Sequence, residues 1–330
     1  MWKYEVLEKF SRILNFTKKI ISKNRLLYEV FILNPSKKRK DKLNAPKIRK
    51  AIDELLAKEE LPIPAAIEIE TYNKCNGDCD FCPINKNLDT REHKFMDKEL
   101  FYLIISQLKE LDFRGCVNCF SNNEPLLDER IFDFVKHIKQ ELPNATKILF
   151  TNGLLLNLEK FVELIPNLDF MVIDHYYEGE LKLRENISKI AKYILENPEL
   201  KSKVKIQTIN KHAIRNNRGG NSKNRKFVYN LKSSCIYPFS QLIIRPTGQI
   251  SLCCNDALGQ MTMGDLSKEK LVDIWKSEKY QKIRKDILIS RQNIPLCKNC
   301  DNFGVFGVDK FLDGYKIGQN WDEIEKLIKE

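Results

Sequence analysis

The chain of 330 residues is long enough for one large domain with appendages or for two domains, and its 42% apolar and 31% charged residues are typical of a folded protein. No apolar run approaches the roughly 20 residues that a membrane-spanning helix needs, and the N-terminus lacks the apolar region of a signal peptide, so we expect a cytoplasmic protein. Its ten cysteines are therefore expected to bind metal or carry redox chemistry rather than form disulfides.

Residues 1–60 are predicted to form a basic helical extension. Apolar side chains recur at helical spacing from Trp2 to Val30. The stretch NPSKKRKDKLNAP then places two prolines and five basic residues together, which predicts an exposed connector. A second short helix is expected over 47–59.

The net charge of +11 lies in this extension, since residues 1–50 hold 15 Lys and Arg against 4 Asp and Glu. We expect the extension to pack on the rest of the chain. The alternatives are binding to an acidic partner or peripheral contact with a membrane surface through Trp2 and Phe10. Nucleic-acid binding is not expected, because the remainder of the chain carries no net positive charge.

Strand-like and helical runs alternate over residues 61–232. Buried, branched runs predict strands over 66–71, 115–121, 147–152, 169–176 and 204–210. Helical runs lie between them over 97–111, 128–142, 157–165 and 183–197. Repeated β-α units imply a parallel sheet or barrel, in which the loops after the strands carry the chemistry.

Three cysteines directly follow the first predicted strand: Cys75, Cys79 and Cys82, with the spacing C-x3-C-x2-C. A structural zinc site needs four ligands, usually as two close pairs, and His93 is the only histidine nearby. A thioredoxin-like motif would leave Cys75 without a role. A short loop with three thiolates suits three irons of a [4Fe–4S] cube and leaves the fourth iron open to another ligand.

This cysteine loop resembles the hallmark of the radical S-adenosylmethionine (SAM) enzymes, whose aromatic residue before the last cysteine is matched by Phe81. SNNEPLL (121–127) resembles the family's Gly-Gly-Glu motif, although Asn122 and Asn123 replace the glycines and only Glu124 is kept. TNGLLL (151–156) and VIDHYY (172–177) resemble the segments after the third strand and on the fourth. The resemblance implies a partial (β/α)6 TIM-like barrel of α/β class. It also implies SAM contacts from Phe81, Asn122, Asn123, Glu124, Thr151, Asn152 and Asp174.

The pattern changes over 233–330, where QLIIRPTGQISLCC predicts a β-hairpin that turns at Thr247-Gly248 and a helix follows. The hairpin, the helix and the cysteines resemble the shortened SPASM module called a twitch domain. That resemblance implies one auxiliary [4Fe–4S] cluster, with a C4 zinc site as the alternative. The implied ligands are Cys235, Cys253, Cys297 and Cys300.

Cys253 and Cys254 are neighbours on a predicted strand, so their side chains point to opposite faces. Cys254 shares its face with Ile250 and Leu252 and is predicted to lie in the core, which leaves Cys253 as the ligand. The same alternation separates Cys116 from Cys119 on the second strand. We interpret those two as buried free thiols.

The family resemblance implies a two-electron oxidation. The cluster reductively cleaves SAM to a 5′-deoxyadenosyl radical, the radical removes hydrogen from the substrate, and the auxiliary cluster accepts an electron. A reducing partner such as flavodoxin or ferredoxin is implied as well. Candidates for the proton acceptor and substrate contacts are Glu70, preferred to Glu68 because it lies nearer the strand end, together with His175 and Arg218 or Arg215.

Three functions follow as alternatives. The first is an oxidoreductase acting on a small hydroxylated molecule, such as a sugar or aminocyclitol. The second is a maturase that modifies a ribosomally made peptide. The third is a non-enzymatic iron–sulfur or zinc protein, against which the retained Glu124 argues.

Overall fold

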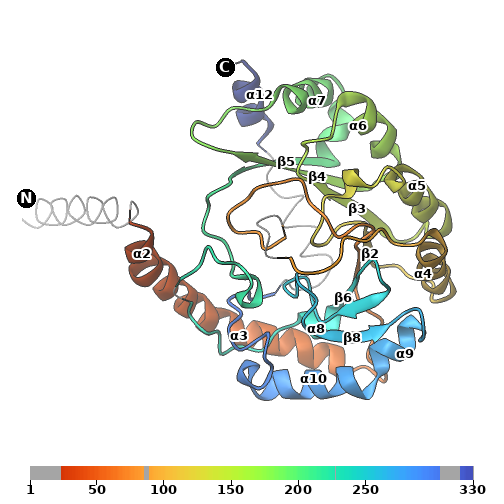
Figure 1. Ribbon diagram of the computed structural model, residues 1–330, viewed down its shortest axis with the longest axis vertical. Coiled ribbons are helices and arrows are strands. Elements are labelled where there is room, and N and C mark those ends of the chain that lie inside the picture. Colours follow the sequence, from red (N-terminus) through yellow and green to blue (C-terminus); the bar gives the residue numbers. More distant parts are fainter. Residues whose placement is uncertain (1–23, 85–88, 227, 305–319, 330) are drawn as a thin grey trace, which may run out of the picture.

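One curved sheet organises the computed structural model, which describes residues 24–84, 89–226, 228–304 and 320–329 (Figure 1). Within these residues the strand order is β5-β4-β3-β2-β1-β6-β7-β8. Strands β1 to β6 pair in parallel, whereas β7 and β8 are antiparallel additions at one edge. The strands are β1 Ala66–Ile69, β2 Cys116–Asn118, β3 Thr146–Thr151, β4 Phe170–Tyr177, β5 Val204–Asn210, β6 Gln241–Ile244, β7 Gln249–Ser251 and β8 Thr262–Asp265.

Four helices cover the outer face of the parallel strands, as Figure 1 shows: α4 Lys98–Glu110, α5 Ile131–Glu141, α6 Leu158–Leu164 and α7 Glu185–Glu196. Each turns an apolar stripe inward because its apolar residues recur every three or four positions; on α4 they are Phe101, Ile104, Ile105 and Leu108, all fully buried. This arrangement confirms the predicted partial barrel. The shorter helices are η2 Pro125–Leu127, η3 Ile165–Asn167, η4 Pro198–Ser202, η5 Arg218–Gly220, α8 Tyr237–Ser240, α9 Leu271–Lys276, α10 Glu278–Ile289, η6 Arg291–Asn293 and α12 Trp321–Lys329.

The predicted hairpin is present and extends the barrel's own sheet. β6 and β7 pair around a turn in which Gly248 has a φ of +83° and donates its N–H to the carbonyl of Arg245. On its other side β6 pairs with β1, with Ala66 opposite Gln241. The C-terminal cysteine-bearing segment is therefore joined to the barrel by backbone hydrogen bonds.

The N-terminal segment consists of α2 Arg25–Tyr28, a π-helical turn η1 Glu29–Leu33 and one long helix, α3 Asn34–Leu56. The predicted connector over 34–46 and the separate short helix over 47–59 are therefore wrong. Pro35 lies in the first turn, where no N–H is needed, and Pro46 is tolerated inside the helix. Tertiary contacts outweigh its cost, since Ile48 and Ile52 are fully buried against the rest of the chain.

Packing of the extension is thus confirmed for α3, while Trp2 and Phe10, which were named for the alternative of membrane contact, lie outside the described residues. No helix within the described ranges is both long and apolar enough to cross a membrane.

Candidate active site

The loop after β1 carries Cys75, Cys79 and Cys82 close together. The Cys82 N–H donates to the carbonyl of Cys79 at 3.1 Å, and the Gly77 N–H donates to the Cys75 sulfur at 3.3 Å. Burial, together with the charge of the neighbouring Cys82, raises the pKa of Cys75 and of Cys79 to about 12. Thiolates are the ligands of iron–sulfur clusters, and a short loop that carries three cysteines fits such a cluster.

Glu124 ties the end of β2 to the end of β3. One carboxylate oxygen accepts from the Thr151 hydroxyl at 2.7 Å and from the Leu126 N–H at 3.1 Å, and the other accepts from the Asn152 N–H at 2.7 Å. Asn152 also donates from its amide to Asn76 at 2.8 Å, in the cysteine loop. Glu124, Thr151 and Asn152 therefore form one network beside the three cysteines, and burial raises the pKa of Glu124 to about 7.

Asn122 and Asn123, which stand in place of two glycines, are both buried. Asn122 donates from its amide nitrogen to the Cys254 carbonyl at 3.2 Å, and Asn123 accepts from the Ser121 N–H at 3.0 Å. Among the described residues the carbonyl oxygen of Asn122 and the amide nitrogen of Asn123 have no hydrogen-bond partner. Both atoms are thus available to a ligand at the end of β2.

A cavity of about 340 Å³ lies inside the barrel. Its wall includes Phe81 from the cysteine loop and Asp174 from β4, as expected for two residues that contact a ligand. Phe81 packs against Tyr176 with ring centroids 5.9 Å apart, and the Arg215 guanidinium lies 5.4 Å from the centre of the Phe81 ring. Further polar groups on the wall are Glu68, Asn118, Gln207, Asn216, Arg218 and Gln241.

The structure places Glu68 in this cavity and Glu70 away from it, which corrects the preference for Glu70. Glu70 lies one residue beyond β1 and forms an ion pair with Arg91 at 3.0 Å. Glu68 accepts a hydrogen bond from the Gln241 amide at 2.6 Å, across the β1–β6 pairing. Burial raises the pKa of Glu68 to about 7.

His175 is likewise outside the cavity, contrary to its proposed place in the site. Asp174 and Tyr176, its neighbours on β4, line the cavity, so the strand alternation turns His175 to the opposite face. There its Nε2 lies 2.9 Å from the Lys182 carbonyl, and burial lowers its pKa. Arg218, in contrast, lines the cavity and donates to the Cys254 carbonyl at 3.3 Å.

The C-terminal cysteines form a second group. Burial, and then the neighbouring thiols Cys254, Cys297, Cys235 and Cys300, raise the pKa of Cys253. Nowhere in the described part of the chain do three His, Cys, Asp or Glu side chains converge closely enough to hold a single metal ion. Cys235, Cys253, Cys297 and Cys300 are four buried, neighbouring thiols, and an iron–sulfur cube needs four such ligands.

Cys254 packs against the hydrophobic core, as predicted, and it also lines the cavity. The strand β7 ends at Ser251, and the alternation used for the prediction does not extend to residue 254. Cys116 also lines the cavity, whereas Cys119 lies in the core, as expected for opposite faces of β2.

Comparison with known proteins agrees with these two cysteine groups. Residues 69–179 match the radical SAM superfamily, and residues 235–301 match the SPASM iron–sulfur cluster-binding domain. The S-adenosyl-L-methionine-dependent 2-deoxy-scyllo-inosamine dehydrogenase of Niallia circulans is 29% identical over 244 residues, which are 72% of this chain and 93% of that protein.

Solved structures agree as well. The crystal structure of BtrN in complex with AdoMet and 2-DOIA has a TM-score of 0.66 and 25% identity, over 76% of this chain and 98% of that one. BtrN in an open conformation has the same fold, with a TM-score of 0.57 and 24% identity over the same shares. The chain is therefore a radical SAM enzyme that carries an SPASM-type iron–sulfur domain after its barrel, with S-adenosylmethionine and [4Fe–4S] clusters as its cofactors.

Proposed function

We propose that this enzyme is a dehydrogenase that oxidises a hydroxyl group of a small molecule, a sugar or an aminocyclitol, to a ketone. The observation that carries the proposal is a cavity with wall residues next in sequence to a cysteine of each group. Its wall includes Phe81, which precedes Cys82, and Cys254, which follows Cys253. A volume of about 340 Å³ is typical of sites that bind small molecules, which favours a small substrate.

In this proposal Cys75, Cys79 and Cys82 hold the cluster that binds SAM, and Glu124, Asn122 and Asn123 receive the polar groups of its methionine part. Thr151 and Asn152 keep Glu124 in place, and Asp174 and Phe81 contact the rest of SAM. When bound, the cluster and SAM supply a 5′-deoxyadenosyl radical that removes one hydrogen atom from the substrate carbon. The residues of the barrel keep that carbon in position and exclude water.

The oxidation also releases a proton and an electron, because a secondary alcohol becomes a ketone by losing one hydrogen atom, one proton and one electron. Glu68 is the proposed proton acceptor, since it lines the cavity and its pKa, raised to about 7 by burial, suits a general base near neutral pH. Cys235, Cys253, Cys297 and Cys300 would hold an auxiliary cluster, which would supply an acceptor for the electron. A flavodoxin or ferredoxin is the proposed donor of the electron that starts the reaction.

Substrate contacts are assigned to the polar groups of the cavity wall. Gln207, which pairs with Asp174 across β4 and β5, is one of these groups. Arg218, Gln241 and Asn118 supply further donors and acceptors for hydroxyl groups. The relative from Niallia circulans is named for an inosamine, which is an aminocyclitol, and we extend that substrate class to this chain.

Anaerobic reconstitution is expected to give on the order of eight irons per chain, for two [4Fe–4S] clusters. Incubation with SAM, a reductant and a panel of sugars and aminocyclitols should then yield 5′-deoxyadenosine and a substrate lighter by two hydrogens, both measured by mass spectrometry. A protein that binds about four irons, or that yields 5′-deoxyadenosine without oxidising any member of the panel, would contradict the proposed dehydrogenase. The matched control is the reaction without reductant.

A further inference from the structure

One face of α3 holds the C-terminal cysteine segment at two points. Lys37 forms an ion pair with the Asp301 carboxylate at 2.8 Å and donates to the Asp301 carbonyl at 2.6 Å. One helical turn later, Asp41 accepts from the N–H groups of Lys232 at 2.8 Å and Ser233 at 3.1 Å. Asp41 and Asp301 are both buried, so these contacts between α3 and the C-terminal segment are shielded from water.

The two points of contact flank the proposed auxiliary site. Ser233 lies two residues before Cys235, and Asp301 directly follows Cys300. Arg291 joins the same two segments from inside, since its guanidinium donates to the carbonyls of Ser233 at 2.6 Å, Ser234 at 3.0 Å and Asn302 at 2.8 Å. The segment before Cys235 and the segment after Cys300 are thus both held in place, by Arg291 on one side and by α3 on the other.

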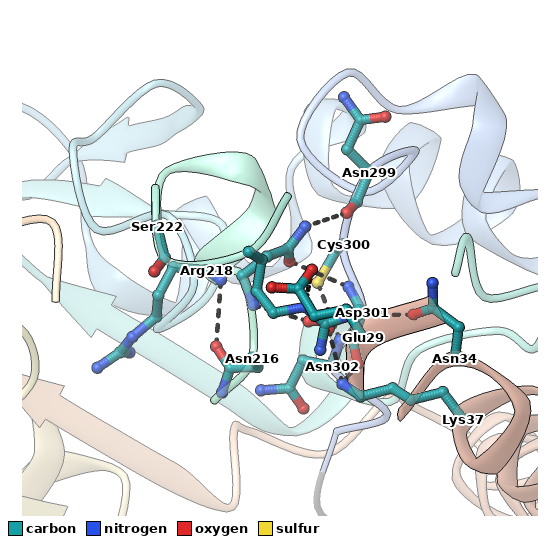
Figure 2. Close-up of polar contacts among 12 residues, drawn as sticks. Glu29, Asn34, Lys37, Asn216, Arg218, Ser222, Asn299, Cys300, Asp301 and Asn302 are labelled. Carbon is teal, nitrogen blue, oxygen red and sulfur yellow. Dashed lines mark hydrogen bonds and ion pairs between the residues drawn. The ribbon is translucent and has the colours of Figure 1, made fainter. Parts of the chain in front are cut away.

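Asp301 also lies beside the loop that carries Asn216 and Arg218, as Figure 2 shows. Its carboxylate accepts from the Asn217 N–H at 2.8 Å, and its own N–H donates to the Asn217 side chain at 3.2 Å. Asn217 lies between Asn216 and Arg218, which line the cavity. Arg218 has a φ of +49°, a left-handed conformation that costs energy for a residue with a side chain and persists only where its surroundings fix it.

A second cation completes the group around Asp301. The Arg225 guanidinium lies 3.1 Å from the Asp301 carboxylate, and its other amino group donates to the Asn34 side chain, in the first turn of α3, at 3.1 Å. Lys37 is only 14% exposed, and Asp301 and Arg225 are closed to solvent at their side chains. Charges buried this deeply interact strongly with one another and with any charge placed beside them.

We propose that α3 completes the auxiliary site: the Lys37–Asp301 ion pair positions Cys300 on one side and Arg218 on the other, and sets the charge around the cluster. Lys37 and Asp301 are positioning residues, since neither lines the cavity. The inference rests on the proposed assignment of Cys235, Cys253, Cys297 and Cys300 to an auxiliary cluster.

Charge gives this role a signature that a purely structural contact lacks. The reduction potential of an iron–sulfur cluster depends on the net charge around it, because reduction adds an electron. Lys37 stabilises the reduced cluster and Asp301 the oxidised one. Replacing Lys37 by Met is therefore expected to lower the potential, and replacing Asp301 by Asn to raise it.

The test uses the full chain with Cys75, Cys79 and Cys82 all replaced by Ala, so that only the auxiliary cluster is reconstituted. Its potential is measured by redox titration followed by electron paramagnetic resonance, alone and with K37M, D301N or K37R. The expected result is opposite shifts for K37M and D301N, with K37R close to the unchanged background. The matched control is K50M on the same helix, where Lys50 is exposed and pairs with Glu54.

Each outcome decides between the two proposals. Suppose that the triple-alanine background binds four irons and that K37M and D301N shift its potential in the same direction or not at all. That result would overturn the role of the Lys37–Asp301 pair and leave the auxiliary site in place. No cluster in the background would remove the auxiliary site itself. Because no substrate is used, failure to oxidise an aminocyclitol does not affect the titration. If K37M alone loses iron, K37R shows the cause. K37R must keep both the iron content and the potential of the background if the positive charge of Lys37 is what matters.

Discussion

Replacing Glu68 by Gln is expected to lower the rate of ketone formation by on the order of 10²- to 10⁴-fold, which is the usual contribution of a general base. Gln has the same shape and can still accept the hydrogen bond from the Gln241 amide, so the cavity should keep its form. Cleavage of SAM, measured as 5′-deoxyadenosine, should continue. The measurement is the ratio of ketone to 5′-deoxyadenosine, which falls if the substrate radical forms but cannot lose its proton.

The pH dependence sharpens the same prediction. Burial raises the pKa of Glu68 to about 7, and only the ionised carboxylate accepts a proton. Ketone formation should therefore increase as the pH rises through about 7, and this limb should vanish in E68Q. E70Q is the matched control, because Glu70 pairs with Arg91 outside the cavity wall. An unchanged product ratio in E68Q would assign the proton to another group.

Replacing Cys235 and Cys297 together by Ala is expected to abolish ketone formation while 5′-deoxyadenosine is still released. Both thiols are buried beside Cys253 and Cys300, and loss of two ligands should remove the auxiliary cluster. The substrate electron then has no acceptor. Iron per chain should fall from on the order of eight to on the order of four, measured by colorimetric analysis alongside both products.

Two single replacements serve as controls for this pair. C254A should keep all the iron, because Cys253 and not Cys254 is the proposed ligand, and C119A should do so because Cys119 lies in the core. Ketone formation by the Cys235/Cys297 double variant would rule out the auxiliary cluster as the electron acceptor. Loss of all iron in it would show that the two sites do not assemble independently.

The barrel was predictable because its strands are buried on both faces and its helices are amphipathic. Each predicted strand from 66–71 to 204–210 begins within one residue of an observed one, and the four covering helices begin within three residues of their predicted starts. These signals are local, since composition and period alone define them. The cysteine loop after β1 was equally local, as three thiolates within eight positions have few alternative uses.

The errors have long-range causes. The charged stretch over 34–46 is a poor helix candidate by itself, and it is helical because Asp41 and Lys37 find partners near residues 232 and 301. The preference for Glu70 over Glu68 failed because no local pattern indicates the ion pair between Glu70 and Arg91, which lies twenty-one positions later. The assignment of His175 to the site was an avoidable error. Asp174 and Tyr176 flank His175 on one strand, and side chains alternate between the two faces of a strand, so His175 points away from both.

The pairing of β6 with β1 has a consequence for how this enzyme can be divided. A chain cut at residue 232 would leave β1 as a bare sheet edge, because the N–H and carbonyl groups that now pair with β6 would lose their partners. The loop with Cys75, Cys79 and Cys82 leaves that same strand. Any exchange of C-terminal modules between related enzymes must therefore carry β6 with the barrel, so that the cut falls at the turn after Ile244.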